Sequence, residues 1–379
     1  LGLDADALAR LPDLEALRAL PILRKAEVQE LGPRLRADDV PDALCVDYHT
    51  SGTTGTPLTI RVTREAVARS FAIAWRMRER FGLLRDMPHA TFNGRSIIPV
   101  AQRRPPYWTR NWAAGQTLFS HHHMRPDALP AYIAALQRGR FEYVTGYPSS
   151  LYVIASAMLE RGAALPWRCR AVLTSSETLS ARQRETVARA FDAPVGDFYG
   201  MVELVATAGQ CARGRYHFDH EVGVTEFEPL PGLPNTGRLI STGLLNDATP
   251  LIRYDTGDIV RRATTPCPCG RVGLSAERVD GRVESYVRTP DGALVGRLDH
   301  VYKGLHGVRE SQIIQTAPDQ LRVKIVKAPG YRPEDARALL CALRERLGVA
   351  MRVELDFVDA IPRTPSGKLR AVISQLDDP

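Results

Sequence analysis

The sequence predicts an α/β fold in two parts, with a large multi-layer domain over residues 1–283 and a small α+β domain over residues 284–379. In the first half of the chain, segments with helical periodicity alternate with short apolar segments that end in polar or glycine residues. This alternation is typical of α/β sheets that bind ligands at their strand ends. From about residue 201 to 283, short strands and turns follow one another and predict a β-rich subdomain. After a turn signal at 289–292 (TPDG), apolar strands flank a helical segment at 333–347, which indicates a separate domain.

Each element of the large part is predicted by its hydrophobic period and its boundary residues. Thr63 is suited to cap the first long helix, and Gly82 is suited to stop it. Helices are expected at 64–80, 127–138, 149–161 and 180–191. Strands are expected at 43–46, 58–62, 141–147, 169–176 and 193–200.

The composition is that of an ordinary globular protein, with 379 residues, of which 44% are hydrophobic and 25% are charged. The sequence contains no run of about 18 apolar residues, so no membrane span is predicted. The stretch at 1–20 is amphipathic, unlike a signal peptide. The six cysteines are unevenly spaced, which does not suggest a secreted disulfide framework. These observations predict a cytoplasmic protein without a membrane partner.

The positive charge is unevenly divided between arginine and lysine. The formal net charge is +7, but the arginines are spread along the chain and no basic run is interleaved with aromatic residues, so no nucleic-acid partner is expected. Only five of the 50 basic residues are lysines, and none lies between Lys25 and Lys303. A lysine that takes part in phosphate chemistry in the large part is therefore expected to come from the C-terminal region.

Residues 48–60 read YHTSGTTGTPLTI, a stretch rich in glycine and hydroxyl side chains. Glycine lets the backbone turn with its amides pointing inward, and Ser or Thr adds donors, so such a cluster forms a nest for an anion. It departs from the ordinary phosphate loop in two ways. No lysine follows Gly55, and Pro57 stands near the position where that lysine would be. Taken alone, the loop is equally compatible with a polar hairpin turn.

Four further motifs follow this loop in order along the chain. They are DFYGMVEL at 197–204, RYDTGD at 253–258, DGRVESYV at 280–287 and PRTPSGKLR at 362–370. Together with TSGTTGTP, they resemble the core motifs of the adenylate-forming superfamily of acyl-coenzyme A synthetases, peptide-synthetase adenylation domains and luciferases. The closer resemblance is to the phenylacetate–coenzyme A ligase branch and its capsule-polysaccharide-locus relatives, and rests on LPILRKAEVQEL, GYPSSLYVIAS and CPCGR.

The resemblance implies ATP-dependent activation of a small-molecule carboxylic acid to an acyl-adenylate, with release of pyrophosphate. The acyl group then passes to an acceptor, by default coenzyme A. An amine, a hydroxyl or a carrier-protein thiol is the alternative acceptor, and a catalytically silent nucleotide-binding protein is a second alternative. The chemistry requires groups that hold the phosphates and stabilise the charge on the α-phosphoryl oxygens.

The resemblance also assigns roles to individual residues. In the family the first loop cradles the β- and γ-phosphates, a role implied here for Ser51, Gly52, Thr53, Thr54 and Gly55.

Four further positions complete the implied nucleotide site around the second and third motifs. Glu203 is the catalytic glutamate that holds Mg²⁺, while Tyr199 and Gly200 lie against the adenine and the α-phosphate. Asp258 accepts hydrogen bonds from the ribose hydroxyls, a role that suits a carboxylate. Val202 departs from the family, because many members have Thr or Ser there.

The remaining implied roles concern the nucleotide border and the last domain. Ser176 and Glu177 border the adenine, although an N-cap for the helix at 180 explains them nearly as well, and Arg282 is also assigned to the nucleotide. Lys368 is the catalytic lysine of adenylation. It reaches the nucleotide only if the small domain is mobile and swings about a hinge at Glu284.

Cysteine spacing predicts a structural zinc site. Cys267 and Cys269 form a tight chelating turn, and Cys211 with His217 would complete a tetrahedral set, as in related members of the branch. His220 is the alternative to His217, and buried core cysteines are the alternative to a metal site.

Histidines 121–123 resemble a metal tract, but no second cluster lies nearby in the sequence, so no metal is expected there. Relatives have a histidine and a polar or aromatic residue near the acyl pocket in this region. His123 is therefore a candidate for contact with the acid substrate. Tyr147 is a candidate to line the acid pocket together with Trp75, Trp108 and Trp112, and a core position is the alternative for these aromatic residues.

Overall fold

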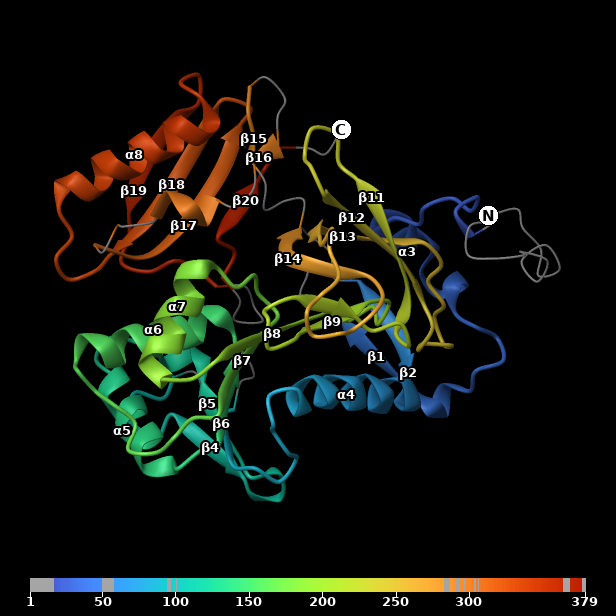
Figure 1. Ribbon diagram of the computed structural model, residues 1–379, viewed down its shortest axis with the longest axis horizontal. Coiled ribbons are helices and arrows are strands. Elements are labelled where there is room, and N and C mark those ends of the chain that lie inside the picture. Colours follow the sequence, from blue (N-terminus) through green and yellow to red (C-terminus); the bar gives the residue numbers. More distant parts are fainter. Residues whose placement is uncertain are drawn as a thin grey trace. The chain divides into compact units, whose positions relative to one another are not determined.

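The computed structural model describes residues 17–49, 58–93, 97–99, 101–282, 287–290, 294–295, 298–302, 305, 307–363 and 369–376. The chain divides into two compact units, Leu1–Arg85 with Gly196–Val279, and Asp86–Val195 with Asp280–Pro379. Figure 1 shows sheets accompanied by helices, which confirms the predicted α/β class. The predicted boundary near residue 283 stays a prediction, since residues 283–286 are outside the described part.

The first unit joins an N-terminal hairpin and helices to the predicted β-rich subdomain. Its strands from β8 onward are neighbours in the order β11-β12-β13-β14-β10-β9-β8. Its elements are α3 (Lys25–Leu31), the 3₁₀ helices η1 (Gly32–Leu35) and η2 (Asp42–Leu44), β1 (Cys45–His49), β2 (Thr59–Thr63), α4 (Arg64–Glu79), β8 (Val195–Gly200), β9 (Thr207–Gln210), β10 (Tyr216–Phe218), β11 (Gly223–Pro229), β12 (Thr236–Gly243), β13 (Tyr254–Arg262) and β14 (Ser275–Arg282).

The strands on either side of the predicted phosphate loop pair with each other. β1 and β2 are antiparallel, and His49 lies opposite Thr59, so the two ends of the loop are held side by side. Ile60 and Val62 of β2 are fully buried, which fixes the register of this hairpin. The Thr63 side chain then accepts a hydrogen bond from the Ala66 amide and caps α4, as predicted.

The second unit begins with a mostly parallel sheet. Its strands are neighbours in the order β7-β6-β3-β5-β4, and only β4 is antiparallel to its partner. Helix α6 packs against β3 and β6, and α7 packs against β7 and α6. The elements are β3 (His89–Asn93), β4 (Trp108–Asn111), η3 (Trp112–Ala114), β5 (Gln116–Ser120), η4 (His121–His123), α5 (Leu129–Gly139), β6 (Tyr143–Gly146), α6 (Pro148–Glu160), β7 (Ala171–Ser175) and α7 (Ala181–Phe191).

This parallel sheet determines where its polar side chains gather. The carboxyl ends of β5, β6 and β7 lie at one edge, because the three strands run in the same direction. The residues that follow these ends are His121, Tyr147 and Ser176. Such an edge is the usual ligand site of an α/β sheet.

The C-terminal segment of the second unit has a small sheet with a hydrophobic core of its own. Its strand order is β19-β18-β17-β20, and Leu339 and Leu343 of its helix are fully buried with Val323 and Ile325. This confirms the predicted small α+β architecture. Its elements are β15 (Val287–Arg288), β16 (Leu294–Val295), η6 (Leu298–Tyr302), β17 (Val308–Ala317), β18 (Gln320–Lys327), α8 (Pro333–Leu347), β19 (Arg352–Phe357) and β20 (Val372–Ser374).

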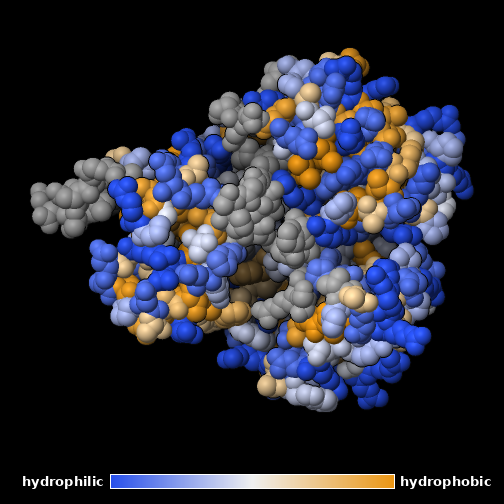
Figure 2. Space-filling view, turned by 180° about the vertical axis from the view of Figure 1, so that it is seen from behind, coloured by the Kyte–Doolittle hydropathy of each residue, from blue (hydrophilic) through white to orange (hydrophobic). Residues whose placement is uncertain are grey.

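Hydrophilic residues are interspersed with hydrophobic ones over the face of the molecule in Figure 2. Several arginines form ion pairs with acidic side chains, including Arg61 with Asp47 at 3.0 Å and Arg261 with Glu277 at 3.2 Å. Part of the positive charge is therefore paired at the protein surface.

Candidate functional site

Two of the predicted motifs are joined by reciprocal tyrosine–carboxylate hydrogen bonds in the first unit. The Tyr199 hydroxyl of DFYGMVEL donates to Asp258 Oδ2 at 2.7 Å, and the Tyr254 hydroxyl of RYDTGD donates to Glu203 Oε1 at 3.3 Å. Each motif thus supplies the tyrosine that binds the carboxylate of the other. Tyr254 was not among the predicted site residues, although it lies within a motif that the sequence singles out.

The backbone around Asp258 fixes the direction of its carboxylate. Gly257 has a φ of +71°, in the left-handed region that favours glycine, and its amide donates to Asp255 Oδ1 at 2.9 Å. The Asp258 amide donates to the Thr256 hydroxyl at 3.1 Å. Burial and the Asp258 charge raise the pKa of Tyr199 well above its ordinary value, so Tyr199 stays protonated and remains a donor.

Glu203 and Asp258 are both buried, with exposed fractions of 3% and 7%. A buried carboxylate is retained only where donors or a cation compensate for the loss of water. The two tyrosines supply part of that compensation. The arrangement brings two acidic groups from separate motifs into defined positions, as a nucleotide and metal site requires.

A second polar group lies at the carboxyl edge of the parallel sheet. Ser176, directly after β7, has a φ of +71°, an uncommon conformation for a residue other than glycine. The next residue, Glu177, accepts hydrogen bonds from the Ser149 amide at 2.9 Å and the Ser149 hydroxyl at 3.0 Å. It also accepts one from the Leu369 amide at 2.8 Å. Loss of solvent raises the pKa of Glu177, while these donors and the Arg363 charge act in the opposite direction.

His121 lies at the same edge and was not predicted as a site residue. Its Nδ1 is 2.6 Å from the Ser150 hydroxyl, and its ring is 6.1 Å from the ring of Tyr147. Burial, followed by the charge of Arg363, lowers the pKa of His121 to about 4, so the imidazole is neutral at neutral pH. Arg363 itself forms an ion pair with Glu310 of β17.

His123, the predicted substrate-side histidine, is fully buried. Its Nδ1 is 2.7 Å from the Ser120 hydroxyl, and its ring stacks on Tyr107 with a centroid distance of 5.4 Å. Tyr147, the second substrate candidate, is the residue before α6 and is partly buried. Contact of either residue with an acid stays a prediction.

Several predicted site residues lie outside the described part of the chain. They are Ser51, Gly52, Thr53, Thr54 and Gly55 of the phosphate loop, the hinge residue Glu284, the catalytic Lys368 and the side chain of Arg282.

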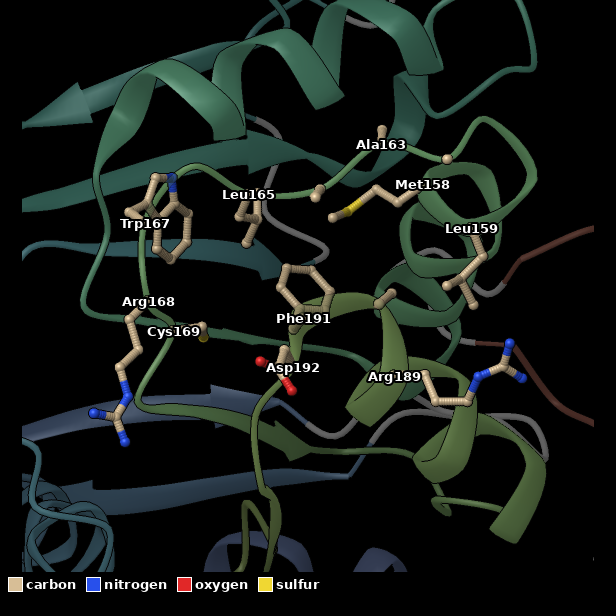
Figure 3. A pocket seen from close by; sticks show the side chains of 13 residues that line it. Met158, Leu159, Ala163, Leu165, Trp167, Arg168, Cys169, Arg189, Phe191 and Asp192 are labelled. Atoms are coloured by element: carbon tan, nitrogen blue, oxygen red, sulfur yellow. The ribbon is translucent and has the colours of Figure 1, made fainter.

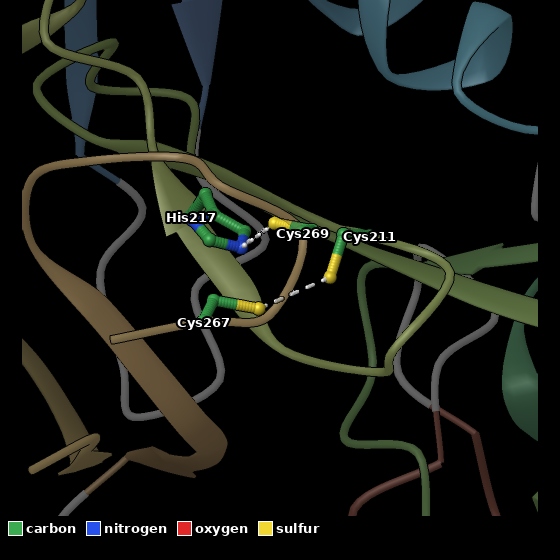
Figure 4. A group of neighbouring side chains, drawn as sticks. All are labelled: Cys211, His217, Cys267 and Cys269. Carbon is green, nitrogen blue, oxygen red and sulfur yellow. Dashed lines mark hydrogen bonds between the residues drawn. The ribbon is translucent and has the colours of Figure 1, made fainter. Parts of the chain in front are cut away.

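The four predicted metal ligands meet in the first unit (Figure 4). Cys211 follows β9, His217 belongs to β10, and Cys267 and Cys269 lie in the turn between β13 and β14. Their ligand atoms all lie within 4.8 Å of one another, with 3.8 Å between the sulfurs of Cys211 and Cys267 and 3.3 Å from Cys269 Sγ to His217 Nε2.

These distances fit a tetrahedral metal ion. Zn–S bonds of about 2.3 Å place two sulfurs about 3.8 Å apart in a tetrahedron, and Zn–N bonds are only slightly shorter. His217, rather than the alternative His220, belongs to the cluster. The ring of His220 instead packs against Gly273, and a Cβ added to Gly273 would lie only 2.1 Å from His220 Nε2.

A pocket of about 420 Å³ opens beside the ends of α6 and α7 (Figure 3). Its lining includes Met158, Leu165, Phe191, Arg168, Arg189 and Asp192. None of the predicted site residues lines it, so this pocket is separate from the groups described above.

No helix in the described part of the chain combines the length and the apolar character needed to cross a membrane. The cytoplasmic location stays a prediction.

Comparison with known proteins extends over nearly the whole chain. The CapK C-terminal domain family model matches residues 287–375. The chain is 26% identical over 332 residues to Protein CapK of Staphylococcus aureus, covering 86% of this chain and 74% of that protein. It is 25% identical over 406 residues to the phenylacetate-coenzyme A ligase of Thermus thermophilus, covering 95% of this chain and 87% of that protein.

A similar solved structure is that of 2-hydroxyisobutyryl-CoA ligase in complex with 2-HIB-AMP. Its TM-score is 0.71 at 19% sequence identity, and the match covers 97% of this chain and 82% of that one, which shows a shared fold. The comparisons confirm the resemblance that the motifs predict, to the adenylate-forming superfamily and, within it, to the phenylacetate–coenzyme A ligase-like branch.

Proposed function

We propose that this chain is an AMP-forming ligase that activates a carboxylic acid with ATP and then transfers the acyl group to coenzyme A. The observation that carries the proposal is the pair of reciprocal tyrosine–carboxylate bonds, which unites Glu203 and Asp258 from two motifs of the adenylate-forming superfamily. Similarity to a phenylacetate-coenzyme A ligase over 95% of the chain supports it.

The reaction takes place in two steps. A carboxylate is a poor electrophile because its leaving group would be oxide. Its oxygen therefore attacks the α-phosphorus of ATP, and the bond to the bridging oxygen breaks to release pyrophosphate. In the second step the thiolate of coenzyme A attacks the acyl carbon, AMP leaves, and a thioester forms.

The residues of the chain divide this work. Asp258, oriented by Tyr199, accepts hydrogen bonds from the ribose hydroxyls, and the loop at 50–57 holds the terminal phosphates. Glu203 would bind Mg²⁺, which favours carboxylate oxygens and neutralises phosphate charge when bound. Lys368 supplies the cation that stabilises the α-phosphoryl group and orients the acid.

The cysteine and histidine cluster has a separate, structural role. Four protein ligands leave no open position for a substrate, so a zinc ion at Cys211, His217, Cys267 and Cys269 would hold the turn after β13 to β9 and β10. Loss of this ion is expected to lower stability more than it changes the chemistry.

The test is release of pyrophosphate from ATP across a panel of carboxylic acids, measured first without and then with coenzyme A. Acid-dependent release, with thioester formed only when coenzyme A is added, supports the proposal. Acid-dependent release with transfer to an added amine, hydroxyl compound or carrier protein, but not to coenzyme A, refutes the acceptor alone. ATP binding without release for any acid would indicate a catalytically silent nucleotide-binding protein.

A further inference from the structure

Glu177 connects the parallel sheet of the second unit to the segment that carries the predicted catalytic lysine. Its Oε1 accepts hydrogen bonds from the Ser149 hydroxyl and from the Leu369 amide, while Oε2 accepts one from the Ser149 amide. Ser149 lies in the first turn of α6, so one side of the carboxylate is fixed at a helix N-terminus. The other side holds a backbone group that is 192 positions away in the chain.

The position of Leu369 gives this contact its significance. Leu369 directly follows Lys368, so the hydrogen bond to Glu177 holds the peptide bond that joins the lysine to its neighbour. A hydrogen bond from a backbone amide to a carboxylate is charge-assisted and therefore stronger than one between neutral groups.

Arg363, which precedes the same segment in the sequence, also acts on Glu177. Arg363 pairs with Glu310, and its positive charge opposes the rise in the pKa of Glu177 that burial causes, while it adds to the fall in the pKa of His121 that burial causes. The segment 364–368 is therefore flanked by two described residues that both act on Glu177, Arg363 through its charge and Leu369 through its amide.

We propose that Glu177 is a positioning residue that holds the backbone at Leu369, next in sequence to the predicted catalytic lysine, for adenylation, an inference that rests on the proposed function. This role differs from the contact with adenine that the resemblance implies. The lysine must leave after adenylation so that the acceptor can enter. A hydrogen bond to a charged group changes an equilibrium by about 10- to 100-fold, which is enough to favour docking and small enough to be reversed.

Two variants remove the contact from opposite sides. Glu177→Gln weakens the acceptor, and Leu369→Pro deletes the donor while leaving Glu177 and the start of α6 intact. Each should slow acid-dependent pyrophosphate release by about 10- to 100-fold, and Leu369→Pro should change acyl transfer from a supplied acyl-adenylate by less than about twofold. Glu185→Gln, an exposed glutamate on α7, is the matched control and should leave both steps unchanged.

The double variant separates a specific contact from general damage. If the two residues act through one hydrogen bond, Glu177→Gln combined with Leu369→Pro should be no slower in adenylation than the slower single variant. Additive losses, or equal losses in adenylation and transfer, would overturn the proposal.

A readout independent of activity is hydrogen–deuterium exchange of the Leu369 amide, followed by mass spectrometry. In Glu177→Gln this amide should exchange about 10- to 100-fold faster than in the wild type, while it should be unchanged in Glu185→Gln. Equal exchange in wild type and Glu177→Gln would refute the docking contact. If exchange changes as expected but the wild type releases no pyrophosphate with any acid, the proposed function fails while the contact stands.

Discussion

Replacing Tyr199 with phenylalanine tests whether its hydrogen bond orients a nucleotide ligand. The substitution removes a hydroxyl that lies 2.7 Å from Asp258 Oδ2 and keeps the ring. The bond joins a neutral donor to a carboxylate that is only 7% exposed, so its loss should cost about 1.5–3 kcal/mol, or a factor of about 10 to 100. With Asp258 less firmly oriented, we expect the KM for ATP to rise about tenfold, at the lower end of that range, with a smaller change in kcat.

The same unit offers a matched control. The Tyr216 hydroxyl donates to Asp197 Oδ2 at 2.5 Å, and both residues are 5% exposed, but neither has a predicted role at the nucleotide. Tyr199→Phe and Tyr216→Phe should both lower the Tm, and only Tyr199→Phe should raise the KM for ATP. An unchanged KM in Tyr199→Phe, or an equal rise in both variants, would refute the assignment of Asp258 to the nucleotide.

Metal analysis of protein purified without chelators should find about one zinc ion per chain. The zinc should be absent in Cys269→Ser and retained in Cys341→Ser, because Cys341 lies outside the cluster. A zinc-free wild type would contradict this prediction. Burial lowers the pKa of His121 from 6.5 to about 4. Between these two pH values the unfolded chain binds a proton at His121 that the folded chain does not bind. The free energy of unfolding should therefore fall as the pH decreases from 6.5 to 4. Denaturant unfolding at several pH values should show a smaller fall in the free energy of unfolding for His121→Asn than for the wild type. An equal dependence on pH in the two proteins would refute the assignment of this effect to His121. Glu203→Ala should reduce turnover and its dependence on Mg²⁺ while ATP binding persists, and a magnesium titration with wild-type behaviour would count against a metal role. Glu284→Pro should form acyl-adenylate in a rapid-quench experiment but stall before transfer, and normal transfer would argue against a hinge there.

Local features of the fold were predictable because they depend on neighbouring residues. The Thr63 cap and the apolar period of α4 lie within one segment, and the expected helices at 127–138 and 149–161 are observed as α5 and α6 within two residues at each end. The strand after the phosphate loop was also predictable, because its alternating residues match a half-buried strand. The strand before the loop was predicted at 43–46 from an apolar run, but it lies at Cys45–His49, after the 3₁₀ helix Asp42–Leu44.

Contacts between distant segments were not predictable from one sequence. The Tyr254–Glu203 bond spans 51 positions and the Leu369–Glu177 bond spans 192, and no local pattern specifies either partner. The choice between His217 and His220 depended on strand geometry. His217 lies within β10, and its side chain is directed at the cysteines, whereas His220 lies beyond the strand.

The most direct test of the proposed mechanism is acid-dependent pyrophosphate release by Lys368→Ala. The chain has no lysine between Lys25 and Lys303, so no other lysine in that part can take the place of Lys368. Release should fall by about 10²-fold or more, as when another transition-state donor is removed, while transfer from a supplied acyl-adenylate persists. Lys324→Ala, which removes a lysine from β18 in the same domain, should leave both steps unchanged. Wild-type release by Lys368→Ala would contradict both the catalytic assignment and the domain movement inferred from it.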